Sequence, residues 1–282
     1  MKYSSIALAM AALTSASFAA TVTFEPVLYP DANGADPSIV PPSSTVGVDG
    51  WTQSEPSLDT DPVLGPAPYF FTAENPLGGQ GAFLGPYFGT PSFDPLTVSR
   101  SFSVVSTYTS SLGVGTYGGV YFGFEGTIVD STLAFPDRND FGVTLGTGGS
   151  TMFEMVLRPV TPDDATSDWQ IFYTIAGGSE VDTGTTFSPG ALVNFSVQFD
   201  MTGLTFSADG GGGGSITFSG TPTGYDSAST DDLDVAFYFT QGADTDFGDN
   251  GLFIDNVTVV PEPSMAVLGA LGGLAFFRRR RK

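Results

Sequence analysis

The chain has 282 residues and a mass of 29.3 kDa, with 30 acidic residues against 9 basic ones and neither histidine nor cysteine. The missing residue types exclude disulfides, thiol nucleophiles, thiolate or imidazole metal sites and histidine-dependent catalysis. Only three cations, Arg100, Arg138 and Arg158, lie between residues 21 and 260. This acidic region would repel phosphates, so a nucleic-acid partner is excluded.

The first 19 residues have the pattern of a secretory signal peptide. Lys2 precedes an apolar stretch at residues 6–13, and Ser17 and Ala19 have the small side chains that a cleavage site after Ala19 requires. The apolar stretch is too short to span a bilayer. We therefore expect cleavage after Ala19 and export of the rest of the chain. A buried N-terminal helix is the alternative interpretation.

Residues 20–260 are predicted to form one all-β domain, an antiparallel β-sandwich. Apolar and polar residues alternate with a period of two, as in strands with one buried and one solvated face. Turn residues such as Gly177-Gly178 separate these runs, and no helical period extends over a dozen residues. The predicted strands are 97–105, 119–129, 141–145, 152–160, 169–175, 193–200, 204–208, 216–218, 235–239 and 252–260.

The segment 21–95 is richer in proline and glycine, and its strands are less distinct. A linker could have this composition, but aromatic residues such as Trp51 and Tyr69-Phe70-Phe71 argue against a solvated segment. We interpret it as the opening edge strands and loops of the same sandwich.

Several segments of this domain resemble a known family. Residues 24–29, 48–51 and 78–85 are similar to the opening of concanavalin A-like (LamG-like) jelly rolls on bacterial surface proteins. Residues 252–259 resemble the final strand of such domains. The resemblance implies a concanavalin A-like jelly roll, and a shared fold carries little information on function.

Two carboxylates in predicted strands, Glu125 and Glu154, are candidates for glycoside hydrolysis, which needs a pair about 5–9 Å apart. The Glu-x-Asp-x-x-Glu pattern of jelly-roll glucanases is absent, because residues 155–159 read Met-Val-Leu-Arg-Pro. We therefore predict that the protein is not an enzyme, and we keep a carboxylate-based glycanase as a hypothesis to be tested.

Aromatic rings that could stack on sugars are also present. The candidates are Trp51, Tyr108, Tyr117, Tyr121 and Trp169. Trp169 belongs to an alternating strand, so we expect it in the core. A carbohydrate-binding module is therefore an alternative function, although the sequence does not show whether these rings converge.

An acidic segment late in the domain is a candidate calcium site. Asp244, Asp246, Asp249 and Asn250 offer hard oxygen ligands on a glycine-bearing loop between two predicted strands. The spacing differs from that of an EF-hand loop. A solvated acidic turn is the alternative.

The last 22 residues have three parts in order. Pro261-Glu262-Pro263 comes first, an apolar stretch at 265–277 follows, and the cluster Arg278, Arg279, Arg280, Arg281 and Lys282 comes last. The prolines hold an extended segment, and the cationic cluster stays on the cytoplasmic side of a membrane. As a helix the apolar stretch would be about 20 Å long, against about 30 Å of hydrocarbon, which favours a transient anchor.

This order resembles the PEP-CTERM sorting signal, which exosortase enzymes recognise in bacteria with Gram-negative-type envelopes. The resemblance implies that residues 261–282 hold the exported protein in the inner membrane until an exosortase cuts near Pro261-Glu262-Pro263. The protein would then reach the cell surface or the extracellular matrix, often alongside exopolysaccharide. We therefore expect a non-enzymatic envelope or matrix protein, and the alternative is a lectin-like module assisted by Ca²⁺.

Overall fold

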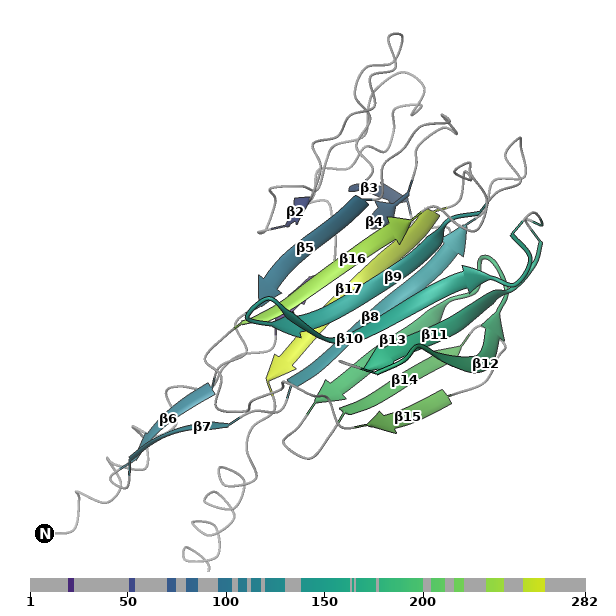
Figure 1. The fold of residues 1–282 in the computed structure, drawn as a ribbon. Helices are drawn as coiled ribbons and strands as arrows, with labels where there is room; N and C mark the ends of the chain where they lie inside the picture. The colour runs from purple at the N-terminus through teal and green to yellow at the C-terminus, as the bar shows by residue number, and fades with distance from the viewer. Residues whose placement is uncertain are drawn as a thin grey trace, which may run out of the picture.

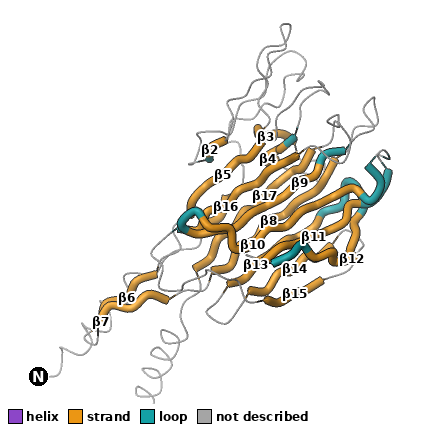
Figure 2. Tube along the Cα trace, viewed as in Figure 1, coloured by secondary structure: helices purple, strands orange, loops and turns teal. Residues whose placement is uncertain are grey.

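Two antiparallel sheets packed against each other make up most of the described part of the protein, as its computed structural model shows (Figure 1). The structure describes residues 20–22, 51–53, 70–74, 80–85, 96–102, 106–110, 113–117, 120–129, 138–162, 164, 166–175, 178–199, 204–210, 216–220, 232–240 and 251–261. These residues form only strands, turns and loops (Figure 2). The predicted all-β, antiparallel sandwich is therefore confirmed.

Sheet A contains the last strand of the described chain near its middle. Its order is β15 (Ile216–Gly220), β14 (Leu204–Gly210), β13 (Val193–Phe199), β8 (Val120–Val129), β17 (Gly251–Pro261), β4 (Gln80–Leu84) and β3 (Phe70–Glu74). A short strand, β1 (Ala20–Val22), also pairs with β17. All of these pairs are antiparallel.

Sheet B lies against sheet A. Its order is β12 (Val181–Phe187), β11 (Trp169–Ile175), β10 (Ser150–Pro159), β9 (Asp140–Thr147), β16 (Leu233–Thr240), β5 (Leu96–Phe102) and β2 (Thr52–Gln53). A hairpin of β6 (Ser106–Ser110) and β7 (Gly113–Tyr117) forms a separate two-stranded sheet.

The core lies between the sheets and is rich in phenylalanine. Phe237 of β16 contacts Phe122 and Phe124 of β8, with ring centroids 6.4 and 5.1 Å apart, and it also lies 6.0 Å from the ring of Trp51. Farther along the sandwich, Phe153 of β10 meets Phe206 of β14 at 5.1 Å. These contacts between buried aromatic side chains join sheet B to sheet A.

The predicted strands are confirmed with small differences at their ends. The predicted strand 97–105 is β5, which ends at Phe102, and the predicted strand 141–145 extends to Asp140–Thr147 in β9. In the opening segment, β2 and β3 lie at sheet edges as expected, whereas β4 lies inside sheet A between β17 and β3. The alternation identifies a strand, but its position in the sheet depends on distant partners.

Some predictions concern residues outside the described ranges. These are the signal peptide at 1–19, the calcium ligands Asp244, Asp246, Asp249 and Asn250, and the tail from Glu262 to the cluster at 278–282. Pro261 is described and is the last residue of β17, opposite Val120 of β8. In the part of the chain that the structure describes, no helix has the length and hydropathy that crossing a membrane requires.

The aromatic contact between the sheets should dominate stability. Replacing Phe237 by alanine removes a fully buried ring that touches both sheets, so we expect unfolding to cost about 3–5 kcal/mol less. Urea denaturation followed by tryptophan fluorescence measures the loss. The control is Val181→Ala, at a side chain that is 39% exposed, which should change stability by less than about 0.5 kcal/mol. Equal losses in the two variants would contradict this account of the core.

Candidate functional site

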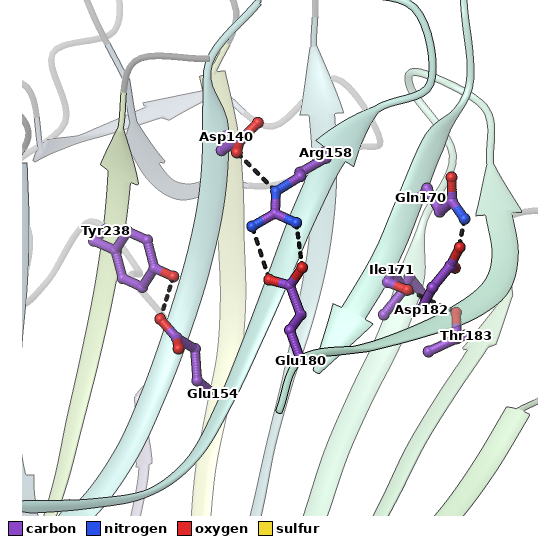
Figure 3. A network of polar contacts seen from close by, with 9 residues as sticks. All are labelled: Asp140, Glu154, Arg158, Gln170, Ile171, Glu180, Asp182, Thr183 and Tyr238. Carbon is purple, nitrogen blue, oxygen red and sulfur yellow. Dashed lines mark hydrogen bonds and ion pairs between the residues drawn. The ribbon is translucent and has the colours of Figure 1, made fainter. Parts of the chain in front are cut away.

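The outward face of sheet B holds three neighbouring groups of hydrogen-bonded polar side chains (Figure 3). Side chains alternate along a strand, so the residues between the buried ones share this face. They come from β16, β9, β10 and β11, and residues at and just before the start of β12 complete the set. We call the following residues the sheet B network: Asp140, Glu154, Arg158, Gln170, Glu180, Asp182 and Tyr238.

Arg158 of β10 is the centre of one half of the network. Its Nε donates to Oδ2 of Asp140 at 3.0 Å, and its two terminal nitrogens donate to the two carboxylate oxygens of Glu180 at 2.6 and 2.8 Å. The guanidinium also lies 4.7 Å from the centre of the Phe172 ring. This combination of a bidentate carboxylate pair and an aromatic contact holds the planar group in one orientation.

The same contacts shift two pKa values. Hydrogen bonds to Glu180 raise the pKa of Arg158, so the guanidinium stays charged. Burial raises the pKa of Asp140, and this effect outweighs the opposing hydrogen bond and charge of Arg158. Asp140 therefore loses its proton less readily in the folded state than in the unfolded state.

Tyr238 and Glu154 form the second half. The phenol of Tyr238 donates to Oε1 of Glu154 at 2.6 Å, although the two residues lie on β16 and β10, with β9 between them. The ring can cross β9 because Gly142, its register partner, has no side chain, and a Cβ there would overlap the ring. Burial and Glu154 raise the pKa of Tyr238, so its hydroxyl remains a proton donor.

The third part lies where β11 meets the edge strand β12. Gln170 donates its side-chain amide to Oδ1 of Asp182, which also accepts the backbone N–H of Gly184 at 2.7 Å. Gly184 has a φ of 66°, a left-handed conformation that favours glycine, and the register shifts between Gln170 and Phe172. This irregularity in β12 orients the side chain of Asp182 toward Gln170.

All three cations of residues 21–260 lie over aromatic rings. The guanidinium carbons of Arg100, Arg138 and Arg158 are 4.5, 4.3 and 4.7 Å from the ring centres of Phe102, Trp169 and Phe172. Arg138 is buried and donates to the carbonyl oxygens of Asp164 and Ser167, both at 3.0 Å. These positive charges are therefore engaged inside the domain.

The structure describes the side chains of three candidate sugar-stacking rings, Trp51, Trp169 and Tyr121. Trp169 is fully buried, which confirms the expectation that it packs in the core, and Trp51 is fully buried as well. Burial removes Trp51 from the candidates, because its ring is not accessible to a ligand. Tyr121 is 36% exposed on β8 of sheet A. Tyr108 and Tyr117 belong to β6 and β7, and their side chains lie outside what the structure describes.

The two candidate catalytic carboxylates lie on different sheets. Glu125 follows the buried Phe124 on β8, so it points away from the core on sheet A, where Oε2 accepts a hydrogen bond of 2.8 Å from Asn256. Glu154 lies on the outward face of sheet B. The core separates the two faces, and the pair therefore cannot flank one glycosidic bond.

The structure adds no metal centre among the residues that it describes. Within those ranges, no group of three or more acidic side chains is placed to hold an ion. The acidic segment that carries Asp244, Asp246, Asp249 and Asn250 lies outside them, so calcium binding stays a prediction.

Comparisons with known proteins give structural similarity only. No family model and no curated protein matches the chain. Among solved structures, an alginate lyase from Klebsiella pneumoniae has a TM-score of 0.48 and 8% identity, covering 75% of this chain and 95% of the lyase. Lectin II from Ulex europaeus has a TM-score of 0.44 and 9% identity, covering 87% and 99%. The CBM2 module of the evolved Dit of Lactobacillus casei BL23 phage J-1 has a TM-score of 0.41 and 14% identity, covering 60% and 74%. Such low scores leave the ligand and activity of this chain open.

The raised pKa of Asp140 predicts a pH dependence of stability. The folded state binds this proton more tightly than the unfolded state, whose pKa is the ordinary 3.8. The resulting stabilisation is fully present below that value and is lost as the pH rises through the higher folded pKa. Wild type should therefore lose stability relative to Asp140→Asn as the pH rises from about 4. Urea denaturation at several pH values measures this difference.

Asp164 provides a control of opposite sign. Hydrogen bonds from Thr166 lower the pKa of Asp164, so its contribution is present above the ordinary value and is lost as the pH falls. Wild type should gain stability relative to Asp164→Asn as the pH rises toward the ordinary value of 3.8, and it should keep this gain at higher pH. The same trend for both variants would contradict the distinct environments of the two carboxylates.

Proposed function

We propose that this chain is an exported, acidic β-sandwich of the concanavalin A-like jelly-roll type that binds polysaccharide without cleaving it. The binding surface is the outward face of sheet B, centred on the sheet B network. The proposal rests on one observation above all: donors and acceptors from five neighbouring strands are held in place before any ligand arrives.

A sugar ring offers hydroxyl groups along its edge and C–H groups on its faces. The network supplies carboxylate acceptors, an amide and a guanidinium, and Phe172 and Tyr238 add partly buried aromatic rings beside them. Side chains that are already ordered lose little rotational freedom on binding. A sheet face of this kind suits an extended chain of sugars better than a compact ligand that needs a deep pocket.

The charges of the surface indicate which polysaccharides it favours. The network carries four carboxylates and one guanidinium, and that guanidinium is already paired with Asp140 and Glu180. The other two cations of the domain lie over their own aromatic rings. Uronate or sulfate groups would meet uncompensated negative charge, so we propose a neutral or amine-bearing polysaccharide as the ligand.

A binding role without catalysis fits the chemistry of the network. Glu154 accepts a hydrogen bond from the hydroxyl of Tyr238, while Asp140 and Glu180 hold Arg158. A phenol with a raised pKa is a poor general base at neutral pH. Glu125 and Glu154, the carboxylates considered for hydrolysis, face opposite sides of the molecule.

Export and sorting belong to the same proposal. Residues 1–19 would direct the chain out of the cytoplasm, and an exosortase would process residues 261–282 at the inner membrane before release to the surface or matrix. Pro261, the first residue of the proposed motif, belongs to β17 and lies opposite Val120 of β8, one residue past the predicted end of the domain. The polysaccharide surface would then operate outside the cell.

Removing Arg158 tests the binding surface. Arg158→Ala frees Asp140 and Glu180 from their partner and uncovers Phe172, so we expect affinity for a neutral polysaccharide to fall at least about tenfold, or about 1.4 kcal/mol. Affinity electrophoresis in gels that contain β-glucan, chitosan or alginate measures binding to a neutral, a cationic and an anionic polymer.

Two further variants make this test specific. Gly142→Ala should also weaken binding, because the added methyl group displaces the ring of Tyr238 without removing a polar side chain. Asn194→Ala alters an exposed amide on β13 of sheet A and should leave binding unchanged. Retention of wild type by alginate alone, or equal losses in all three variants, would contradict the proposal.

The sorting role predicts a processing defect. Replacing Glu262 and Pro263 by alanine alters the motif and keeps Pro261, the residue of the motif that pairs with β8. In a host with an exosortase, we expect the uncut protein to accumulate in the inner membrane. Fractionation with intact-mass measurement detects it. Normal processing of the double variant would refute the role assigned to Pro261-Glu262-Pro263.

A further inference from the structure

The final strand, β17, is covered along one side by two different strands. β4 pairs with Leu252, Phe253 and Ile254, and β1 pairs with Val257, Thr258 and Val259. Along its other side, β17 pairs with β8 as far as Pro261. The short strand β4 pairs with the N-terminal half of β17 only, and β1 pairs with the C-terminal half on the same side.

A bulge in β17 separates these two partners. The register with β8 shifts between Asp255 and Thr258, and Asn256 adopts a φ of 51°, a left-handed conformation that asparagine tolerates better than most residues. Its side-chain amide donates to Glu125 of β8, which anchors the bulge to the sheet. Val22 of β1 and its register partner Val257 in the bulge are both buried, so β1 is packed into the domain.

The antiparallel pairing brings the two ends of the domain together. Ala20 lies opposite Val259, so the chain before Ala20 and the chain after Pro261 leave the sandwich at the same end. We call it the terminal end, and in Figure 1 it is where the yellow arrow of β17 points. The opposite end lies nine residues away along β8, about 30 Å at ~3.3 Å per residue. The backbone N–H of Gly190 donates to the carbonyl oxygen of Ile128, so the end of β12 lies at this opposite end of the sandwich. Phe187 near the end of β12 pairs with Trp169, so the loop before Trp169 lies there as well.

The sequence on both sides of the domain is apolar close to this end. Residues 6–13 precede it, and residues 265–277 follow it. Only Glu262, Pro263 and Ser264 separate Pro261 from Met265, and four steps between Cα atoms span at most about 14 Å. A membrane that takes up residues 265–277 therefore holds the terminal end within about 14 Å of its surface.

We infer that the terminal end is the membrane-facing end of the precursor, and that the lipid bilayer is the partner at this end. The sandwich stands with its strands pointing away from the membrane. The tether is about half as long as the sandwich, so the opposite end cannot reach the bilayer unless the domain lies flat. Lying flat would press a strongly acidic body against anionic lipid, which repels it.

This orientation has a consequence for the sheet B network. The network lies on the side of the sandwich, so it stays open to solvent and to polysaccharide while the protein is still tethered. The inference rests on the proposed export and tail insertion and does not depend on glycan binding.

An engineered disulfide tests the geometry of the terminal end. Thr21 and Thr258 are register partners with side-chain oxygens 3.4 Å apart, and the chain has no cysteine of its own. Thr21→Cys with Thr258→Cys should form a disulfide on mild oxidation and migrate faster without reductant, because the bond closes most of the chain into a loop. Thr21→Cys with Thr161→Cys, at opposite ends, should not. Failure of the first pair to crosslink would overturn the inference.

Energy transfer to the membrane tests the orientation. The full chain is made by cell-free synthesis with vesicles of phosphatidylethanolamine and a minor fraction of phosphatidylglycerol that carry acceptor dyes on their head groups. A donor dye is placed at Tyr121→Cys, whose register partner is Val260, or at Thr161→Cys beyond β10, both at exposed side chains. Because these positions differ by about 30 Å along the strands, transfer should be roughly twofold stronger from position 121.

The two possible failures are distinguishable. Vesicles are first floated on a density gradient, and the full chain should float with them. A chain that does not float would contradict both tail insertion and the inferred orientation. A chain that floats but gives equal transfer from both positions, or stronger transfer from position 161, would overturn the orientation alone and leave the sorting proposal standing.

Discussion

The contact of Phe237 with Phe122 and Phe124 is the constraint from which the rest of the molecule follows. It presses the odd-numbered face of β16 against sheet A, and the period of two then sends Tyr238 outward. The neighbouring strands β9 and β10 are fixed in the same way by their own buried residues. The side chains of the sheet B network on β16, β9 and β10 therefore owe their direction to the core behind them.

The sheet B network also depends on the few positively charged side chains of the domain. The domain has three cations, and each one lies over an aromatic ring. Two of them serve the fold, since Arg138 is buried and Arg100 lies over the buried Phe102. Among the described residues, Arg158 holds two carboxylates, those of Asp140 and Glu180, on an open surface. A protein with so few positive charges would not be expected to attract anionic polymers, and its acidity favours solubility and neutral or cationic partners.

The sequence was informative about strands and uninformative about their neighbours. Alternation placed β13, β11 and β16 because buried and exposed positions repeat along each strand, and it put Trp169 in the core correctly. It could not show that Tyr238 reaches Glu154 over Gly142, because that contact needs the register of three strands far apart in the chain. The pairing of Glu125 with Glu154 as possible catalytic partners failed for the same reason. Outward polar positions in the predicted strands 152–160, 169–175 and 235–239 were the available signal for the network.

The position of β1 connects the fold to the fate of the chain. Three residues that would be the first of the exported protein pair with the strand that leads directly into the tail, and the core includes side chains from both. The edge of β17 is therefore covered by β1 at the end from which both flanking segments leave. Trimming of either segment would occur beside an intact sheet, because Ala20 and Pro261 are already held by backbone pairing. On the proposed sorting route, a fold built in this way would be released from the membrane without rearrangement, and the surface of sheet B would be the same before and after release.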